Sequence, residues 1–388
     1  MRRIFLFVAI MVCLIELNAA NPLYEQFRFG GFQAGYFDTV LYDSDFEYAE
    51  FGYEGHKPVF VQIWYPTDTE TKPQYLQFGD FLKVTGRPGL EVVSEQLQVH
   101  YREMLIRDVI SYNLLSVDSN VFPGYSYDDI LLLLEKTETR SIYKKPDSLS
   151  GFPVILYHHG SQSAPFENYL MAEYLASHGF VFIAAGFHLP FPNTLFGLKP
   201  YDKIIKDEDQ KAVNFMLDYA KTVCAGSKIF FAGHSLGAQM GWRSLASSSA
   251  INGFISLETT LEFKNDSAGI VEYWPELWQK LKVEKPSYPF PVMLCAATGT
   301  AKSFPFFADV DSPWLKFVSA PERFEHNAYT SVFYLRCSLD SNVIQNDLKL
   351  LKDRMKIYAK HLDVIKMFLD DILNNNIAKG TEVLLIGD

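Results

Sequence analysis

Apolar residues recur along this chain in short continuous runs that are separated by longer amphipathic stretches. The runs predict strands at residues 60–66, 153–157, 180–185, 228–232, 253–257, 292–297 and 315–320. Several of them are apolar throughout rather than at alternate positions, which is typical of strands buried on both faces. Strands of this kind occur in parallel sheets that are covered by helices.

The segments between these runs carry helical periodicity. It is present at residues 169–178, at 206–223, after Ser235 and at 347–373. Strands and helices that alternate in this order predict an α/β sandwich. Residues 75–148 break the alternation, with amphipathic stretches at 91–105 and 128–135. We expect one domain over residues 21–388, with this segment as an inserted cap.

The first twenty residues have the layout of a secretory signal peptide. Two arginines precede an apolar run at residues 4–15, and Ala19 and Ala20 follow it. Twelve apolar residues are too few to span a bilayer. We expect cleavage after Ala19 or Ala20 and a secreted or periplasmic mature protein without a stable membrane span.

Charge and composition limit the partners of this protein. The formal net charge is −11, and loss of Arg2, Arg3 and Glu16 with the signal brings the mature chain to about −12. An acidic chain without a basic cluster is a poor partner for nucleic acid or for an anionic membrane surface. Hydrophobic residues make up 48% of the chain, enough for a large core.

Cysteine usage indicates neither a disulfide framework nor a metal site. The mature chain keeps Cys224, Cys295 and Cys337. Cys295 lies in an apolar run and is expected to be a buried thiol, whereas a bridge between Cys224 and Cys337 stays an alternative. The chain has no Cys-x-x-Cys pair and no His-Glu-x-x-His helix, so we expect no metal and no other cofactor.

The most informative motif is a serine between two glycines, directly after the apolar run at residues 229–232. Gly233, Ser235 and Gly237 have the spacing of a nucleophile elbow, in which a sharp turn between a strand and a helix exposes the serine. Glycine is needed on both sides because the flanking backbone comes so close that side chains would clash. The motif predicts Ser235 as a nucleophile.

A serine hydroxyl needs a base that takes its proton. In a parallel α/β sheet the site forms at the carboxyl ends of the strands, and the chain order is serine, acid, histidine. Only His326 and His361 follow Ser235. His361 lies in a helix of mixed charged and apolar residues, where we expect a surface position. His326 lies in the loop after the last predicted strand and is the expected base.

Three carboxylates are candidates for the acid that orients this histidine. Glu258 ends the strand after the elbow, at the edge of the sheet where the site is expected. Asp309 and Asp311 follow the next strand, which is the other usual place for the acid. We favour Glu258 and keep the two aspartates as alternatives.

Backbone N–H groups must stabilise the oxyanion of an acyl-transfer reaction. One donor is expected from Leu236, the residue after the nucleophile. The other is expected from Ser161, in the loop that follows the strand at residues 153–157. His158 and His159 begin this loop, and we expect them to shape it rather than to bind a metal ion.

Aromatic residues gather in the segments expected near this edge of the sheet. They are Phe187, Phe191, Phe196, Trp274, Trp278, Phe304, Phe306, Phe307 and Trp314. A pocket that they line would favour a small ester with an apolar or aromatic group. The alternative is that they pack the cap against the sheet.

Three stretches together resemble one branch of the α/β-hydrolases, namely the platelet-activating-factor acetylhydrolases and dienelactone hydrolases. They are residues 157–161, 175–181 and 233–238, and the resemblance runs from about Phe60 to Tyr329. It implies the α/β-hydrolase fold and a Ser-Asp-His triad whose acid position maps onto Glu258. This chain has glutamate there, which keeps Asp309 and Asp311 open. It also has Ser161-Gln162-Ser163 where the acetylhydrolases are more apolar, so phospholipid specificity is not implied.

These observations together predict a secreted carboxylic-ester hydrolase that works through an acyl-enzyme. Ser235 would attack the ester, His326 would carry the proton, and Glu258 would orient His326. A peptidase or an acyltransferase could use the same triad. An inactive binding protein with this fold is a further alternative, against which stands the presence of serine, acid and histidine in the expected order.

Overall fold

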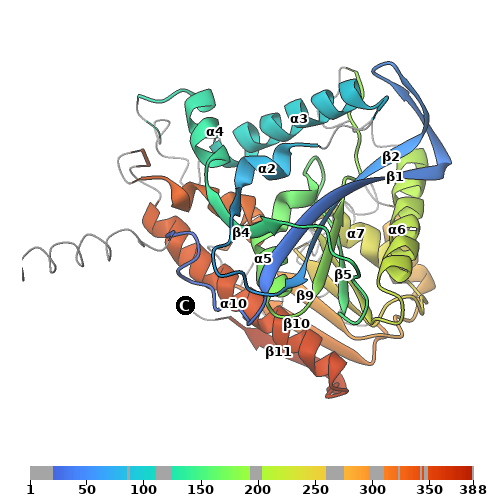
Figure 1. The fold of residues 1–388 in the computed structure, drawn as a ribbon. Helices are drawn as coiled ribbons and strands as arrows, with labels where there is room; N and C mark the ends of the chain where they lie inside the picture. The colour runs from blue at the N-terminus through green and yellow to red at the C-terminus, as the bar shows by residue number, and fades with distance from the viewer. Residues whose placement is uncertain are drawn as a thin grey trace, which may run out of the picture.

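The computed structural model describes residues 21–84, 88–110, 122, 124–192, 203–258, 275–296, 310–321, 324–340, 343–344 and 348–386 (Figure 1). The predicted signal peptide at residues 1–20 lies outside this part of the chain. No helix within the described residues has the length and apolar composition needed to cross a membrane. Cys224, Cys295 and Cys337 are buried thiols, as expected for Cys295.

One eleven-stranded sheet organises the molecule, in the order β11-β10-β9-β8-β7-β5-β6-β2-β1-β4-β3. The strands are β1 (Gln33–Glu50), β2 (Tyr53–Thr67), β3 (Tyr75–Gln77), β4 (Glu138–Tyr143), β5 (Val154–His158), β6 (Val181–Ala185), β7 (Ile229–His234), β8 (Gly253–Leu257), β9 (Val292–Ala296), β10 (Trp314–Ser319) and β11 (Gly380–Leu385). Neighbouring strands from β6 to β11 are parallel, whereas β2 is antiparallel to both β6 and β1. The mostly parallel sheet predicted from the sequence is confirmed.

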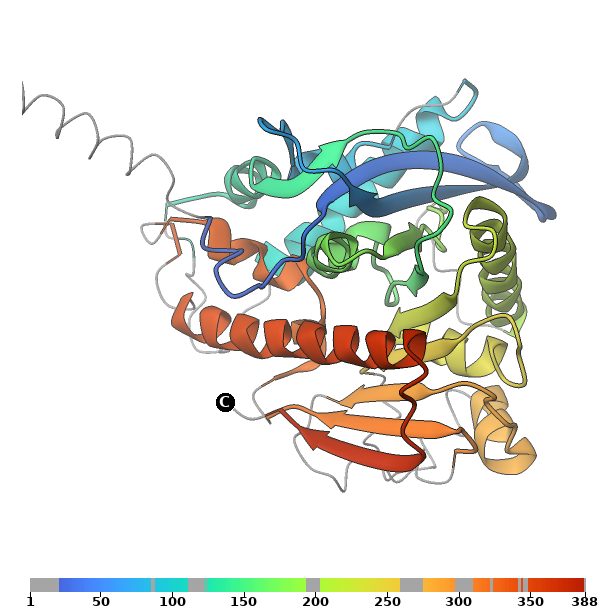
Figure 2. The same cartoon turned by 60° about the horizontal axis from the view of Figure 1, so that its bottom comes forward.

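Helices cover both faces of this sheet (Figures 1 and 2). One face carries α5 (Tyr169–Ser177) and α10 (Leu348–Leu373), and the other carries α6 (Lys203–Val223) and α7 (Leu236–Ser244). Side chains of the central strands alternate between these two cores: Ile155 and Tyr157 of β5 pack with α5 and α10, and Leu156 packs with α6 and α7. Both faces are therefore dry, which explains why the strands are apolar throughout.

The segment expected as a cap contributes two strands to the sheet and several helices to the layer that contains α5 and α10. It contains α2 (Phe78–Leu82), α3 (Glu91–Leu105), the π-helix η2 (Ile106–Ile110) and α4 (Tyr127–Glu135). Its two ends form β3 and β4, and β4 pairs with β1 at the edge of the sheet. The helices share the core of α5 and α10, and η2 reaches the site described below.

The remaining helical turns lie in the connections between the parallel strands. They are η3 (Pro165–Asn168) before α5, α9 (Pro275–Trp278) and η5 (Gln279–Glu284) before β9, and η7 (His326–Tyr329) and η8 (Val332–Ser338) after β10. Because β5, β7, β8 and β10 are parallel, the loops after them meet at one edge of the sheet. These loops carry the residues of the candidate site.

Candidate active site

Ser235 occupies a strained turn between β7 and α7. Its backbone angles are φ 52° and ψ −113°, a conformation that non-glycine residues rarely adopt. Such strain costs about 1–3 kcal/mol and persists where the surrounding structure imposes it. The sharp strand-to-helix turn expected from the glycine-flanked serine is present.

The two flanking glycines are required by close backbone contacts. A Cβ atom on Gly237 would lie 2.1 Å from the carbonyl oxygen of His158, and one on Gly233 would lie 2.5 Å from the carbonyl carbon of Gly237. Neither neighbour can move away, because each is backbone rather than the end of a side chain. The tight approach of α7 to the end of β5 thus depends on glycine at both positions.

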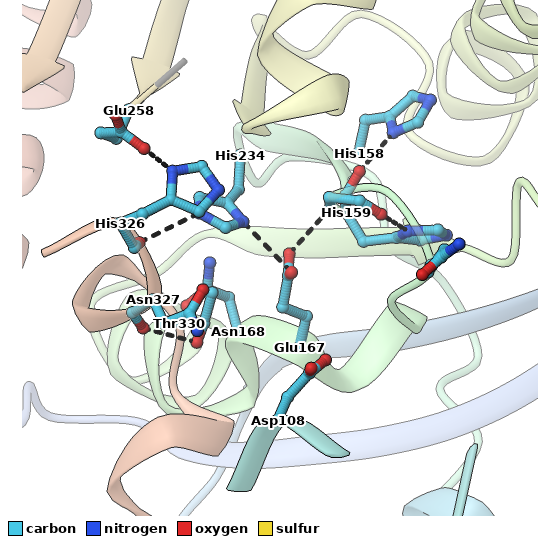
Figure 3. A network of polar contacts seen from close by, with 12 residues as sticks. Asp108, His158, His159, Glu167, Asn168, His234, Glu258, His326, Asn327 and Thr330 are labelled. Atoms are coloured by element: carbon cyan, nitrogen blue, oxygen red, sulfur yellow. Dashed lines mark hydrogen bonds and ion pairs between the residues drawn. The ribbon is translucent and has the colours of Figure 1, made fainter. Parts of the chain in front are cut away.

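His326 and Glu258 contact each other next to this turn (Figure 3). The Nδ1 atom of His326, at the start of η7, faces the Oε2 atom of Glu258, which directly follows β8. The Glu258 side chain is fully buried, whereas 36% of the His326 side chain is exposed. A buried carboxylate against Nδ1 fixes the ring and leaves Nε2 available on its other side.

Backbone hydrogen bonds link Glu258 directly to the elbow. The N–H of Ser235 is shared between the carbonyl oxygens of Leu257 and Glu258, each at 3.1 Å, and the N–H of Glu258 donates to Cys295 at 2.9 Å. Glu258 also has a positive φ of 32°. The strained backbone at Ser235 and the strained backbone at Glu258 therefore hold each other in place.

The alternative acids do not reach this cluster within the described residues. Asp311 is exposed, and its backbone forms an isolated β-bridge with Ser287. Both residues precede β9 and β10 and lie at the amino ends of these strands. Asp311 lies at the opposite edge of the sheet, because the chain has already returned to the start of β10 when it reaches residue 311. Asp309 lies outside the described residues.

A cavity of about 300 Å³ opens beside these side chains. Its lining comes from η2, the loop after β5, the elbow and the segment from η7 to η8: Arg107, Asp108, Gly160, Ser161, Gln162, Ser163, Glu167, His234, Ser235, His326, Asn327, Thr330, Val332 and Phe333. Ser235 and His326 thus face one cavity, as expected for a nucleophile and its base. Ser161 is on the same wall, and Leu236 is the first residue of α7.

The loop after β5 is held by its own histidines and by an arginine of the cap segment. The Nδ1 atoms of His158 and His159 bind the carbonyl oxygens of the residues that follow them, at 2.8 and 2.7 Å. Burial lowers the pKa of both rings, which keeps them neutral. Arg107 donates to the side chain and to the carbonyl of Gln162, which has a positive φ of 56°. These contacts support the expected loop-shaping role of the two histidines.

Burial also governs the pKa of His326. It lowers this pKa, and the neighbouring His234 lowers it further, whereas the carboxylate of Glu167 raises it. The Glu258 carboxylate against Nδ1 acts in the raising sense, because a negative charge stabilises an imidazolium. The ring is therefore neutral at neutral pH and can accept a proton.

His361 is not on the helix surface where the sequence pattern placed it. It is buried, and its ring stacks on Phe324 with a centroid distance of 4.9 Å. The hydroxyl of Tyr329 lies 3.3 Å from its Nε2 atom. The predicted surface position is wrong, because the loop that carries His326 covers this face of α10.

The four described aromatic residues that were expected at the pocket all pack elsewhere. Phe187 stacks on His158 at 3.6 Å between centroids, Phe191 packs on Tyr48, Trp314 packs on Phe368, and Trp278 joins the core of α6 and α7. Phe196, Trp274, Phe304, Phe306 and Phe307 lie outside the described residues. The described lining is mainly polar, with Val332 and Phe333 as its apolar members.

A buried polar network that no sequence motif predicted supports the site (Figure 3). Glu167, at 3% exposure, accepts hydrogen bonds from the Gly160 N–H at 3.1 Å and from the Tyr157 hydroxyl, and it faces His234 Nδ1 at 3.1 Å. Glu167 and Arg107 lie in segments without a motif, so no sequence signal singled them out. His234 stands inside the elbow motif, but its position as the variable residue hid its role.

Comparisons with known proteins bear on the fold. No family model and no curated protein matches the chain. Among solved structures, a ferulic acid esterase from Streptomyces cinnamoneus superposes with a TM-score of 0.50 at 14% identity, over 86% of this chain and 89% of the esterase. The chain has the α/β-hydrolase fold.

Other solved structures match less well. Brefeldin A esterase, a bacterial homologue of human hormone-sensitive lipase, has 10% identity and a TM-score of 0.38 over 88% of this chain and 78% of its own. Est1E from Butyrivibrio proteoclasticus, solved with ferulic acid bound, has 16% identity and a TM-score of 0.32 over 57% of this chain and 92% of its own.

Proposed function

We propose that this protein is a serine hydrolase that cleaves carboxylic esters through an acyl-enzyme. The observation that carries the proposal is the shared cavity of Ser235 and His326, with Glu258 buried against the far side of the His326 ring. In this reading His326 takes the proton of the Ser235 hydroxyl, Ser235 attacks the ester carbonyl, and the protonated ring then gives the proton to the leaving alcohol. Water repeats the sequence and releases the acid.

The oxyanion of the tetrahedral intermediate would be held by backbone N–H groups of Leu236 and Ser161. Leu236 begins α7, where N–H groups have no partner within the helix and the helix dipole favours negative charge. Ser161 lies on the cavity wall beside the elbow. A Cβ atom on the adjacent Gly160 would lie 3.5 Å from the Ser235 Cβ atom, so this loop approaches the nucleophile closely.

The substrate is proposed as a small ester that has polar groups next to the scissile bond. Arg107, Asp108, Asn327 and Thr330 supply donors and acceptors on the cavity wall, and Phe333 supplies one aromatic face. Two test substrates distinguish a pocket that binds polar groups from a pocket that is only small. One is an aromatic ester with hydroxyl groups, and the other is a short aliphatic ester. Faster cleavage of the hydroxylated ester supports this assignment.

The experiment that tests the proposed reaction is hydrolysis of an ester panel, with matched amides, by the wild type and by Ser235→Ala. We expect ester hydrolysis to fall on the order of 10³-fold or more in the variant, because the hydroxyl forms the acyl-enzyme. Hydrolysis of amides alone would favour a peptidase. Ester hydrolysis that survives in Ser235→Ala would refute the proposal.

We further propose that residues 1–20 are a cleaved signal peptide and that the protein acts outside the cytoplasm. Packing begins just after the expected cleavage point: Leu23 is fully buried, and its N–H donates to the Asn21 side chain at 3.1 Å. Cleavage after Ala20 would therefore leave a chain whose first residues are already anchored.

A further inference from the structure

Glu167 is a buried carboxylate that the proposed reaction does not use. Its buried side chain belongs to the cavity wall, on the turn η3 that follows the loop after β5. Burial alone would raise the pKa of Glu167, but the adjacent His234 and the hydrogen bonds to its oxygens outweigh burial and lower this pKa to about 2. Glu167 is therefore an anion at neutral pH.

Two of the contacts made by Glu167 lead directly to the reacting groups. The Gly160 N–H donates to Oε2 at 3.1 Å and so fixes the loop that carries Ser161. The His234 Nδ1 atom lies 3.1 Å from Oε1, and His234 Nε2 lies 3.3 Å from the carbonyl oxygen of His326. The His234 and His326 rings are 4.7 Å apart between centroids. Glu167 thus reaches His326 through one side chain.

A third contact leads to the segment after His326. The Tyr157 hydroxyl donates to Glu167 and accepts from Asn168 Nδ2 at 2.6 Å. The side-chain oxygen Oδ1 of Asn168 in turn accepts from the Ser331 N–H at 2.9 Å. Tyr157, Asn168 and Ser331 are all fully buried. One carboxylate therefore connects the two segments that must stay in register around Ser235.

We propose that Glu167 is a positioning residue, which holds the Gly160–Ser163 loop and, through His234, the backbone and ring of His326 in the geometry that the reaction requires. The inference rests on the proposed function. It adds a second carboxylate-histidine pair, Glu167 and His234, behind the pair formed by Glu258 and His326. The charged groups that face His326 from the surrounding elements are Glu258, His234, Glu167, Arg107 and Asp108.

The test compares Glu167→Gln with a matched buried carboxylate. Glu173 is fully buried on the next helix and also makes three hydrogen bonds, to Ser141, Arg140 and Tyr24, away from the cavity. We expect Glu167→Gln to lower kcat roughly 10- to 100-fold with KM changed less than about twofold, since misplaced reacting groups slow the chemical step. Glu173→Gln should retain kcat, and the Tm of both variants shows whether each remains folded. Equal kcat losses in the two variants would overturn the proposal.

A second variant covers the case in which Glu167→Gln does not fold. His234→Asn keeps a polar group near Glu167 but removes the Nε2 contact with the His326 carbonyl. We expect a similar fall in kcat. Where Glu167→Gln folds, the double variant should show no further fall, because both residues act along one path. A wild-type kcat in His234→Asn overturns the inference.

A third measurement separates failure of this inference from failure of the proposed function. The ring signal of His326, assigned with His326→Gln in protein with ¹³C-labelled histidine, requires no turnover. It should shift in Glu167→Gln and stay in place in Glu173→Gln. An unshifted signal in both variants refutes the coupling between Glu167 and His326. If the signal shifts in Glu167→Gln but the protein cleaves no ester, the coupling is supported and only the proposed hydrolase function is refuted.

Discussion

At the scale of single residues, the proposed reaction requires a neutral His326. Only the neutral ring can accept the Ser235 proton, so activity is lost as the pH falls through the pKa of His326. Burial and His234 lower this pKa below its ordinary value of about 6.5. We therefore expect kcat/KM to stay constant down to about pH 6.5 and to fall only below it.

The measurement is a profile of kcat/KM against pH with an ester that does not ionise, with Tm followed over the same range to exclude unfolding. His326→Gln should abolish activity, and His56→Ala, which changes an exposed histidine on β2, should not. An acid limb centred well above pH 6.5 would contradict the assignment of the base.

A second prediction at this scale concerns Glu258. Glu258→Gln should lower kcat by roughly 10²- to 10⁴-fold with little change in KM, because the carboxylate orients His326 and stabilises its charged form without touching the substrate. Asp311→Asn, which alters an exposed carboxylate at the other edge of the sheet, should remain close to the wild type. If Asp311→Asn is crippled while Glu258→Gln stays active, Glu258 is not the acid.

At the scale of elements, Arg107 links the cap segment to the loop after β5. Arg107 of η2 donates to both Gln162 oxygens and to both carboxylate oxygens of Asp108. Arg107→Ala should loosen the loop next to Ser161 and lower kcat/KM roughly 10-fold. Arg102→Ala, which breaks the ion pair between Arg102 of α3 and Glu135 of α4, is the matched control. Equal activities in both variants would show that the cap does not support the loop.

The elements that the sequence predicted well are those whose environment is uniform. Strands buried on both faces, such as β5 and β7, are apolar along nearly their whole length and are therefore recognisable in the sequence. The helix α3 matches its predicted range. The long strand β1 was missed, because its outer half is exposed and carries polar residues. The edge strand β11 was missed for the same reason: its side chains are mostly exposed. Partners along the sheet, rather than local pattern, stabilise such strands.

The residues of the site also differ in how far the sequence predicts them. Ser235 and its two glycines form a local motif that backbone sterics impose, so the sequence predicts them. The meeting of His326 with Glu258 depends on the strand order, which parallel topology makes predictable in outline. Glu167 and Arg107 act through contacts between segments far apart along the chain, with no periodicity or spacing to reveal them. The burial of His361 was likewise hidden, because it depends on a loop that folds back over α10.

At the scale of the whole molecule, the N-terminal segment after the proposed signal belongs to the folded core. Leu23 and Phe27 pack in the same core as α5 and α10. N-terminal sequencing of exported protein should therefore start at Ala20 or Asn21, and a chain that begins at Asn21 should keep the Tm of the exported form. Retention of Met1 in exported protein would contradict the signal peptide.

The proposed reaction requires that Ser235 is a nucleophile activated by His326. Labelling with a fluorophosphonate followed by peptide mapping tests it most directly, because the probe phosphonylates an activated serine whatever the natural ester is. We predict one label per chain, located on Ser235, lost in Ser235→Ala and slowed on the order of 10³-fold or more in His326→Gln. A label on another serine, or equal labelling of Ser235 in wild type and His326→Gln, would contradict the account.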